Sequence, residues 1–77
     1  MARVRYFAAA EELAGCAQEQ RDEPTLAALR ASLAAERPGL GDLLPRCAVL
    51  VDGVRTDADV ALAADALVDV LPPFAGG

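Results

Sequence analysis

The amino-acid sequence predicts an α+β fold in which one main helix packs on one face of a single mixed sheet of four to five strands. Two observations lead to this fold. Strand-like segments flank one long helical segment, in the order strand, strand, helix, strand, short strand, strand. The apolar residues of that helix form one narrow stripe, which a sheet lying across it can cover. In this arrangement we expect the first and last strands to be parallel neighbours in the middle of the sheet.

The N-terminal segment, residues 2–8, alternates in the manner of a strand. Its core face carries Val4 and Tyr6, whereas its other face carries two arginines and Phe7. An alanine-rich stretch up to Ala14 then predicts one or two helical turns. Residues 16–23 are polar and mildly alternating, which predicts a short edge strand.

The main helix opens at Thr25, a favourable N-cap residue. Its apolar stripe has helical spacing and consists of Leu26, Leu29 and Leu33. Pro38-Gly39 predicts the end of this helix and the start of a loop that runs to about Pro45. The leucines of that loop are expected to tuck under the core, and a short helical turn is possible there.

The C-terminal half carries the remaining strands. Residues 47–51 form the most apolar strand and are expected near the centre of the sheet. Asp52-Gly53 predicts a type I′ hairpin turn. In the last strand, residues 66–71, we expect Val68 and Val70 to point inward, because an unpaired Asp69 would be costly to bury.

Composition argues against several functions. Seventy-seven residues allow one domain with a thin core, and the chain contains no lysine and no histidine. We therefore predict no catalytic residue and no metal site, since the two cysteines, Cys16 and Cys47, are too few for zinc and are expected to be reduced. The net charge of −5 argues against nucleic acid and anionic membranes as partners. Without a visible signal peptide or a long apolar run, a cytoplasmic location is expected.

The last six residues are predicted to form an extended, flexible tail, 72–77, that follows a folded domain, 1–71. Two prolines stiffen its start, and Gly76 and Gly77 end it without a Cβ. Fully extended, it would reach about 20 Å. Such a shape suits a carboxylate that enters a narrow site on another protein, although a functionless, frayed end is the alternative.

The outward face of the sheet is predicted to carry a docking patch near the tail. Phe7, Leu67 and Leu71 fall on that face, with Leu50 as a fourth candidate. A cluster of exposed large apolar residues marks an interaction site. If the register were shifted by one residue, these side chains would instead belong to the core.

Two stretches of the chain resemble a known family. The opening, Val4-Arg5-Tyr6-Phe7-Ala8-Ala9-Ala10-Glu11-Glu12-Leu13-Ala14-Gly15, and the ending, Asp69-Val70-Leu71-Pro72-Pro73-Phe74-Ala75-Gly76-Gly77, are similar to the small subunits of molybdopterin synthases. These subunits belong to the ubiquitin-like β-grasp sulfur carriers. The resemblance covers essentially the whole chain, but its specificity lies in the two ends.

The resemblance implies a sulfur-carrier function. The Gly77 carboxylate would be adenylated with ATP by an E1-like adenylyltransferase, and a persulfide sulfur donor would convert it to a thiocarboxylate. The tail, which comprises Pro72, Pro73, Phe74, Ala75 and Gly76, would insert into the active site of the large synthase subunit and deliver sulfur for the dithiolene of the molybdenum cofactor. The chain itself would then be a non-catalytic subunit that holds no permanent cofactor.

Three alternatives remain open. The chain could carry sulfur for thiamine or cysteine biosynthesis, because such carriers share the fold and the Gly-Gly end. It could be a protein modifier that is attached through Gly77 to lysines of other proteins. It could also be an interaction domain whose tail is irrelevant. The sequence does not identify the activating enzyme, the final metal (molybdenum or tungsten) or the oligomeric state.

Overall fold

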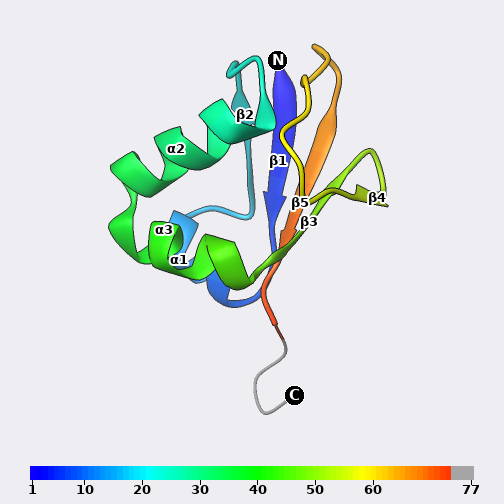
Figure 1. Cartoon of the computed structure of the whole chain (residues 1–77). Helices are drawn as coiled ribbons and strands as arrows, with labels where there is room; N and C mark the ends of the chain where they lie inside the picture. The colour runs from blue at the N-terminus through cyan, green and yellow to red at the C-terminus, as the bar shows by residue number, and fades with distance from the viewer. Residues whose placement is uncertain (74–77) are drawn as a thin grey trace.

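The computed structural model describes residues 1–73 and has a mixed five-stranded sheet with helices on one face (Figure 1). The predicted ubiquitin-like β-grasp fold is confirmed, with α2 as its main helix. In chain order the elements are β1 (Ala2–Tyr6), α1 (Ala9–Ala14), β2 (Gln18–Arg21), α2 (Leu26–Glu36), α3 (Pro38–Leu43), the 3-10 helix η1 (Leu44–Arg46), β3 (Ala48–Val51), β4 (Val54–Arg55) and β5 (Leu67–Leu71).

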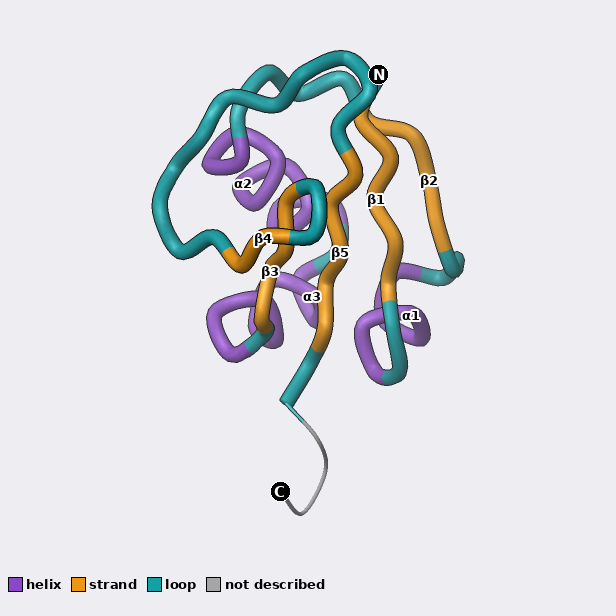
Figure 2. The backbone as a smooth tube through the Cα atoms, turned by 90° about the vertical axis from the view of Figure 1, so that its right-hand side faces the viewer, coloured by secondary structure: helices purple, strands orange, loops and turns teal. Residues whose placement is uncertain are grey.

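The strands lie in the order β2-β1-β5-β3-β4, so β5 occupies the centre (Figure 2). It runs parallel to β1 and antiparallel to β3, which confirms the predicted pairing of the first and last strands. Although β5 itself occupies the centre, the apolar strand β3 lies next to it and is paired on both sides, as expected for an interior strand. Its hairpin turn is as predicted: Asp52 and Gly53 both have positive φ, 51° and 82°, as a type I′ turn requires.

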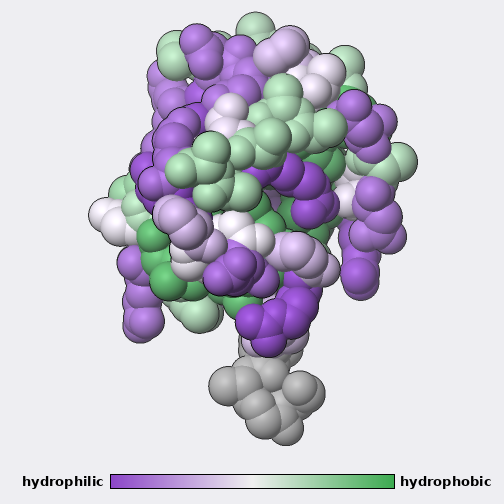
Figure 3. Space-filling view, turned by 60° about the vertical axis from the view of Figure 1, so that its left-hand side comes forward, coloured by the Kyte–Doolittle hydropathy of each residue, from purple (hydrophilic) through white to green (hydrophobic). Residues whose placement is uncertain are grey.

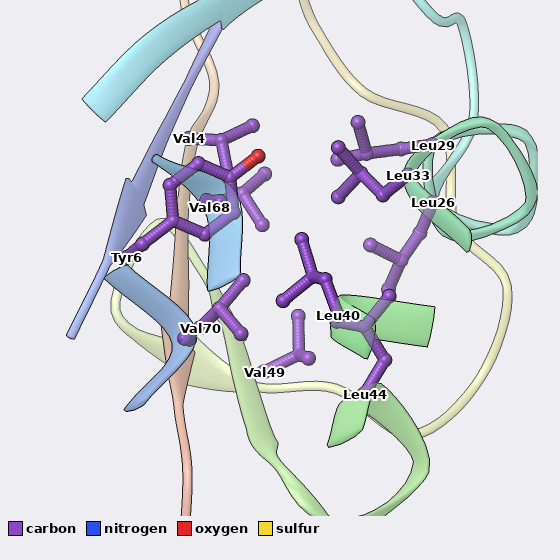
Figure 4. Packing of buried hydrophobic residues seen from close by; sticks show 12 residues of the cluster. Val4, Tyr6, Leu26, Leu29, Leu33, Leu40, Leu44, Val49, Val68 and Val70 are labelled. Carbon is purple, nitrogen blue, oxygen red and sulfur yellow. The ribbon is translucent and has the colours of Figure 1, made fainter. Parts of the chain in front are cut away.

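The core lies between the sheet and α2. The Thr25 hydroxyl caps α2 by accepting a hydrogen bond from the Ala28 amide at 3.1 Å. The three leucines of the predicted stripe point toward the sheet and meet side chains from β1 and β5 (Figure 4). All are at most 2% exposed; they are Leu26, Leu29 and Leu33 on the helix and Val4, Tyr6, Val68 and Val70 on the strands. The register of β1 and β5 is therefore the predicted one, not the alternative shifted by a residue.

The segment after α2 differs from the predicted loop. Helix α2 ends at Glu36, but Pro38 then begins a further helix, α3. Proline is favourable at the first position of a helix, because the amide hydrogen that it lacks would have no partner within the helix there. Helix α3 packs closely on α2: a Cβ on Gly41 would lie 2.8 Å from the Ala34 Cβ. This helix carries Leu40 into the core, where we had expected a loop leucine.

A cluster of charged side chains ties the edge strand β2 to α2. Arg21 donates to Glu23 and Glu36, each at 2.7 Å from its Nη2 atom. Next to it, Glu19 accepts from Arg37 at 2.8 Å and also from the buried Tyr6 hydroxyl. On the side of the molecule that carries the helices, hydrophilic and hydrophobic residues are interspersed (Figure 3).

Candidate functional site: the groove at the root of the tail

The open face of the sheet divides into an apolar end and a charged middle. Figure 2 looks onto this face, with the helices behind it. At the end where β5 leaves the sheet, a groove of about 590 Å³ opens beside the start of the tail. It is lined by Phe7, Ala8, Ala9, Arg46, Ala48, Leu50, Arg55, Leu71, Pro72 and Pro73. Most of this lining is apolar, so the groove suits an apolar side chain of a partner.

A sharp turn after β1 positions Phe7 at the groove. The Ala10 amide donates to the Phe7 carbonyl at 3.0 Å, which closes the turn. Its second residue, Ala8, has φ 50° and ψ −125°, as at the first central position of a type II′ turn. This conformation strains any residue other than glycine. The turn directs the chain into α1, and the Phe7 side chain stays 39% exposed on the open face.

An ion pair crosses the middle of the open face. Arg5 and Asp69 are register partners on β1 and β5, and the guanidinium donates twice to the carboxylate, at 2.6 and 2.9 Å. These hydrogen bonds raise the pKa of Arg5 above its usual value. The Arg5 guanidinium also lies over the Phe7 ring, 5.8 Å from its centroid.

Asp69 shows how the prediction and the structure differ. It lies on the outward face as predicted, yet it is only 8% exposed. Burial is tolerated because the carboxylate has a bidentate partner on the adjacent strand. The argument from an unpaired carboxylate therefore gave the correct face but not the degree of burial.

The structure brings together some of the residues predicted for docking and separates another. Phe7, Leu50 and Leu71 line the groove with Pro72 and Pro73. Leu67 shares their face but lies at the opposite end of β5, beyond Asp69, where its backbone pairs with Asp52. Phe74, Ala75, Gly76 and Gly77 lie outside the described residues.

Two charged groove residues escaped prediction. The position of Arg55 was accessible from the sequence, because a two-residue turn at Asp52-Gly53 places it opposite Leu50, as observed. Arg46 was not, because it ends a 3-10 helix that was expected to be a loop.

Other features that could carry chemistry lie apart from the groove. Both cysteines are free and half-buried. Burial raises the pKa of the Cys47 thiol, which donates to the Leu43 carbonyl at 3.4 Å. Within residues 1–73, no group of three or more side chains could hold a metal ion. No helix in that part of the chain is long and apolar enough to cross a membrane.

Several solved structures are similar to this chain over nearly its whole length. One is a complex of subunits 1 and 2 of the molybdopterin-converting factor from Helicobacter pylori, with 28% identity, a TM-score of 0.77, and coverage of 99% of this chain and 97% of that chain. Another is SAMP1 from Haloferax volcanii, with 25% identity, a TM-score of 0.76, and coverage of 99% and 98%. The HVO 2177 protein from the same organism has 31% identity, a TM-score of 0.78, and coverage of 99% and 85%.

A search of curated proteins finds no match. The model of the ThiS family, in contrast, matches residues 4–77. Because this match includes the strands, the helices and the segment that continues from the groove, the chain belongs to the ThiS family.

Proposed function

We propose that this protein is the sulfur-carrier small subunit of a molybdopterin synthase. The observation that carries the proposal is the apolar groove that continues into the start of the tail at Pro72 and Pro73. A partner that binds the groove would fix the position at which the chain continues beyond Pro73. The Gly77 carboxylate could then be guided into the partner's active site. The similarity to the H. pylori complex of two subunits supports this arrangement.

The chemistry would begin with activation of Gly77. Attack of its carboxylate on ATP gives an acyl adenylate and releases pyrophosphate, and this step would occur on an E1-like adenylyltransferase. A sulfur nucleophile from a persulfide donor then displaces AMP, so that a C–S bond replaces the C–O bond to AMP. The product is an acyl disulfide with the donor, and a second thiol of the donor system then attacks the donor's sulfur. The S–S bond breaks, the donor leaves as a disulfide with that thiol, and Gly77 is left as a thiocarboxylate, whose ionised sulfur is a good nucleophile. This chain would supply the carrier atom and the docking surface, and its partners would supply the catalytic groups.

The test is the mass of the protein isolated from its native organism, with a map of its C-terminal peptide. We expect a fraction whose mass corresponds to sulfur in place of one oxygen, located on Gly77. Incubation with the large synthase subunit and the pterin precursor should remove this sulfur. An unmodified Gly77 that also fails to react with ATP and the organism's adenylyltransferase would refute the proposal.

A variant that lacks Gly76 and Gly77 is the matched control. The core cluster consists of residues that precede Pro72, so this variant should keep the circular dichroism spectrum and Tm of the full chain. It should nevertheless form no adenylate. Loss of the fold in this variant would make its inactivity uninformative, and the Gly77→Ala variant, which retains every backbone atom, would then serve instead.

A second candidate function is protein modification, which the similarity to SAMP1 favours, since SAMP1 is a small archaeal modifier protein. The two functions share activation of Gly77 and differ in the acceptor. Isopeptide bonds between Gly77 and lysines of other proteins, found by mass spectrometry in cell extracts, would favour modification. A carrier for thiamine or cysteine biosynthesis would retain the thiocarboxylate but would not lose sulfur to the pterin precursor.

A further inference from the structure

The charge of the groove is opposite to the charge of the molecule. The chain has a formal net charge of −5, yet both charged residues that line the groove, Arg46 and Arg55, are cationic. Both are exposed, and no carboxylate belongs to the described lining. A partner that approaches the groove therefore meets a positive local field on an acidic protein.

These two charges are available to a partner. Arg55 has its nearest carboxylate oxygen on Asp57 at 3.9 Å, and both side chains are largely exposed, 69% and 87%. Such a pair contributes little and exchanges readily for a better partner. For Arg46, the structure of residues 1–73 shows no ion pair. Arg5 differs, because Asp69 already holds its guanidinium in two hydrogen bonds.

From this we infer that the groove binds a partner segment in which carboxylates flank a large apolar side chain. The inference rests on the proposed function, because it specifies which protein surface that docking site recognises. The apolar side chain would fill the groove between Phe7, Leu50 and Leu71, and the carboxylates would meet Arg46 and Arg55 at its rim.

The distribution of charge also determines the orientation of docking. The protein as a whole is acidic, with a formal net charge of −5, so an acidic partner segment is repelled on average and attracted where Arg46 and Arg55 lie without a carboxylate beside them in the groove lining. Like-charge repulsion of this kind disfavours wrong contacts, in addition to the attraction that favours the right one. The net charge alone would have pointed to a basic partner, which is the opposite chemistry.

The test compares adenylation of variants by the organism's adenylyltransferase, measured as ATP–pyrophosphate exchange. For the double variant Arg46→Glu/Arg55→Glu, we expect kcat/KM to fall about tenfold or more at low salt, mostly through KM. This difference should shrink to about twofold in 0.5 M salt, because salt screens exposed charges. The variant Arg46→Lys/Arg55→Lys keeps both charges and should restore most of the lost kcat/KM, because electrostatic steering depends on the sign and position of exposed charges.

Arg3→Glu is the matched control for charge. It makes the same change at an exposed position on the same face, but at the end where β1 starts, away from the groove. We expect less than about a threefold change in kcat/KM. Because Arg3→Glu makes half the charge change of the double variant, it is compared with the single variant Arg55→Glu, which changes the net charge by the same amount. Equal losses in these two single variants would show that only net charge matters and would overturn the inference. A gain of activity in the groove variant would show that the partner surface is basic.

A second measurement separates failure of this inference from failure of the proposed function. Isotope-labelled protein is titrated, under NMR observation, with a synthetic peptide in which glutamates flank leucine and phenylalanine. Its twin, the control peptide, has glutamine in place of each glutamate. We expect the acidic peptide to shift the amides of Leu50 and Leu71 at lower concentration than its twin does. If adenylation is absent but this preference holds, the proposed function fails and the inference stands. Equal binding of both peptides, or a concentration-dependent dimer that occupies the groove, would refute the inference.

Discussion

Ala8 is one of two non-glycine residues with positive φ among residues 1–73, and the other, Asp52, lies in a hairpin turn that favours this conformation. The Ala8 φ of 50° with ψ of −125° belongs to a turn position that glycine dominates. Strain of this kind tends to occur at functional sites, and here it lies in the wall of the groove, directly after Phe7. The strained turn is therefore part of how the docking surface is built.

The strain at Ala8 predicts a stabilising substitution. Ala8→Gly should raise the free energy of unfolding by about 0.5–1 kcal/mol, because relief of the left-handed strain exceeds the added entropy of the unfolded chain. Chemical denaturation measures this change. The control is Ala31→Gly at an exposed position inside α2, which should lower stability by about 1 kcal/mol. If both variants lose stability, Ala8 is not strained in solution.

At the scale of elements, the contact between α2 and α3 depends on Gly41. A Cβ at this position would lie 2.8 Å from the Ala34 Cβ and 2.9 Å from its Cα, and neither atom can move without moving the helix. Gly41→Ala should therefore separate the two helices and lower the free energy of unfolding by about 1–3 kcal/mol. Gly39→Ala is the matched control, because its Cβ would meet only the mobile Leu13 Cδ2, at 3.1 Å. Helix propensity alone favours alanine over glycine, so a similar loss in both variants would mean that the close approach to Ala34 does not set the cost.

The pair of helices α2 and α3 shows where prediction from the sequence succeeded and where it failed. The helical spacing of Leu26, Leu29 and Leu33 predicted α2 and its buried face. A helix that packs on one sheet buries residues along only one of its faces, and these residues recur with the period of the helix. The sequence Pro-Gly-Leu-Gly-Asp-Leu of α3 has no such pattern, and its glycines lower helix propensity. Its helix depends on tertiary contact with α2, which no local pattern records. The groove was half predicted: alternation placed Phe7 and Leu71, and the hairpin turn could have placed Arg55, but Arg46 comes from the 3-10 helix η1, which no local pattern indicates.

At the scale of the whole molecule, acid stability should follow the charged cluster between β2 and α2. Hydrogen bonds from Arg21 hold the pKa of Glu23 at about 2, and they also lower the pKa of Glu36. Burial raises the pKa of Glu19, but hydrogen bonds from Arg37 and Tyr6 outweigh it, and the pKa is lowered overall. These carboxylates are more acidic in the folded than in the unfolded state. Their stabilisation is complete above the usual glutamate pKa of 4.5 and is lost as the pH falls toward 2.

The free energy of unfolding should therefore fall between about pH 5 and pH 2. The Arg21→Ala variant should be less stable by about 1–3 kcal/mol at pH 7 and should converge on the wild type near pH 2, because protonated glutamates no longer need the guanidinium. Denaturant titrations across this range measure both curves. Arg55→Ala, whose partner is fully solvated, should follow the wild type. Parallel curves for Arg21→Ala and wild type would contradict the assignment.

The central position of β5 has a consequence for synthesis of the protein. Because β5 pairs with both β1 and β3, the sheet stays split until the final strand of the chain has left the ribosome. Arg5 must wait for Asp69, 64 residues later, before its ion pair can form. Folding is accordingly dominated by contacts distant in sequence, which form slowly. A chain that stops before Leu67 lacks the strand that joins β1 to β3, so it cannot complete the sheet, and the ability to fold is linked to synthesis of almost the entire chain.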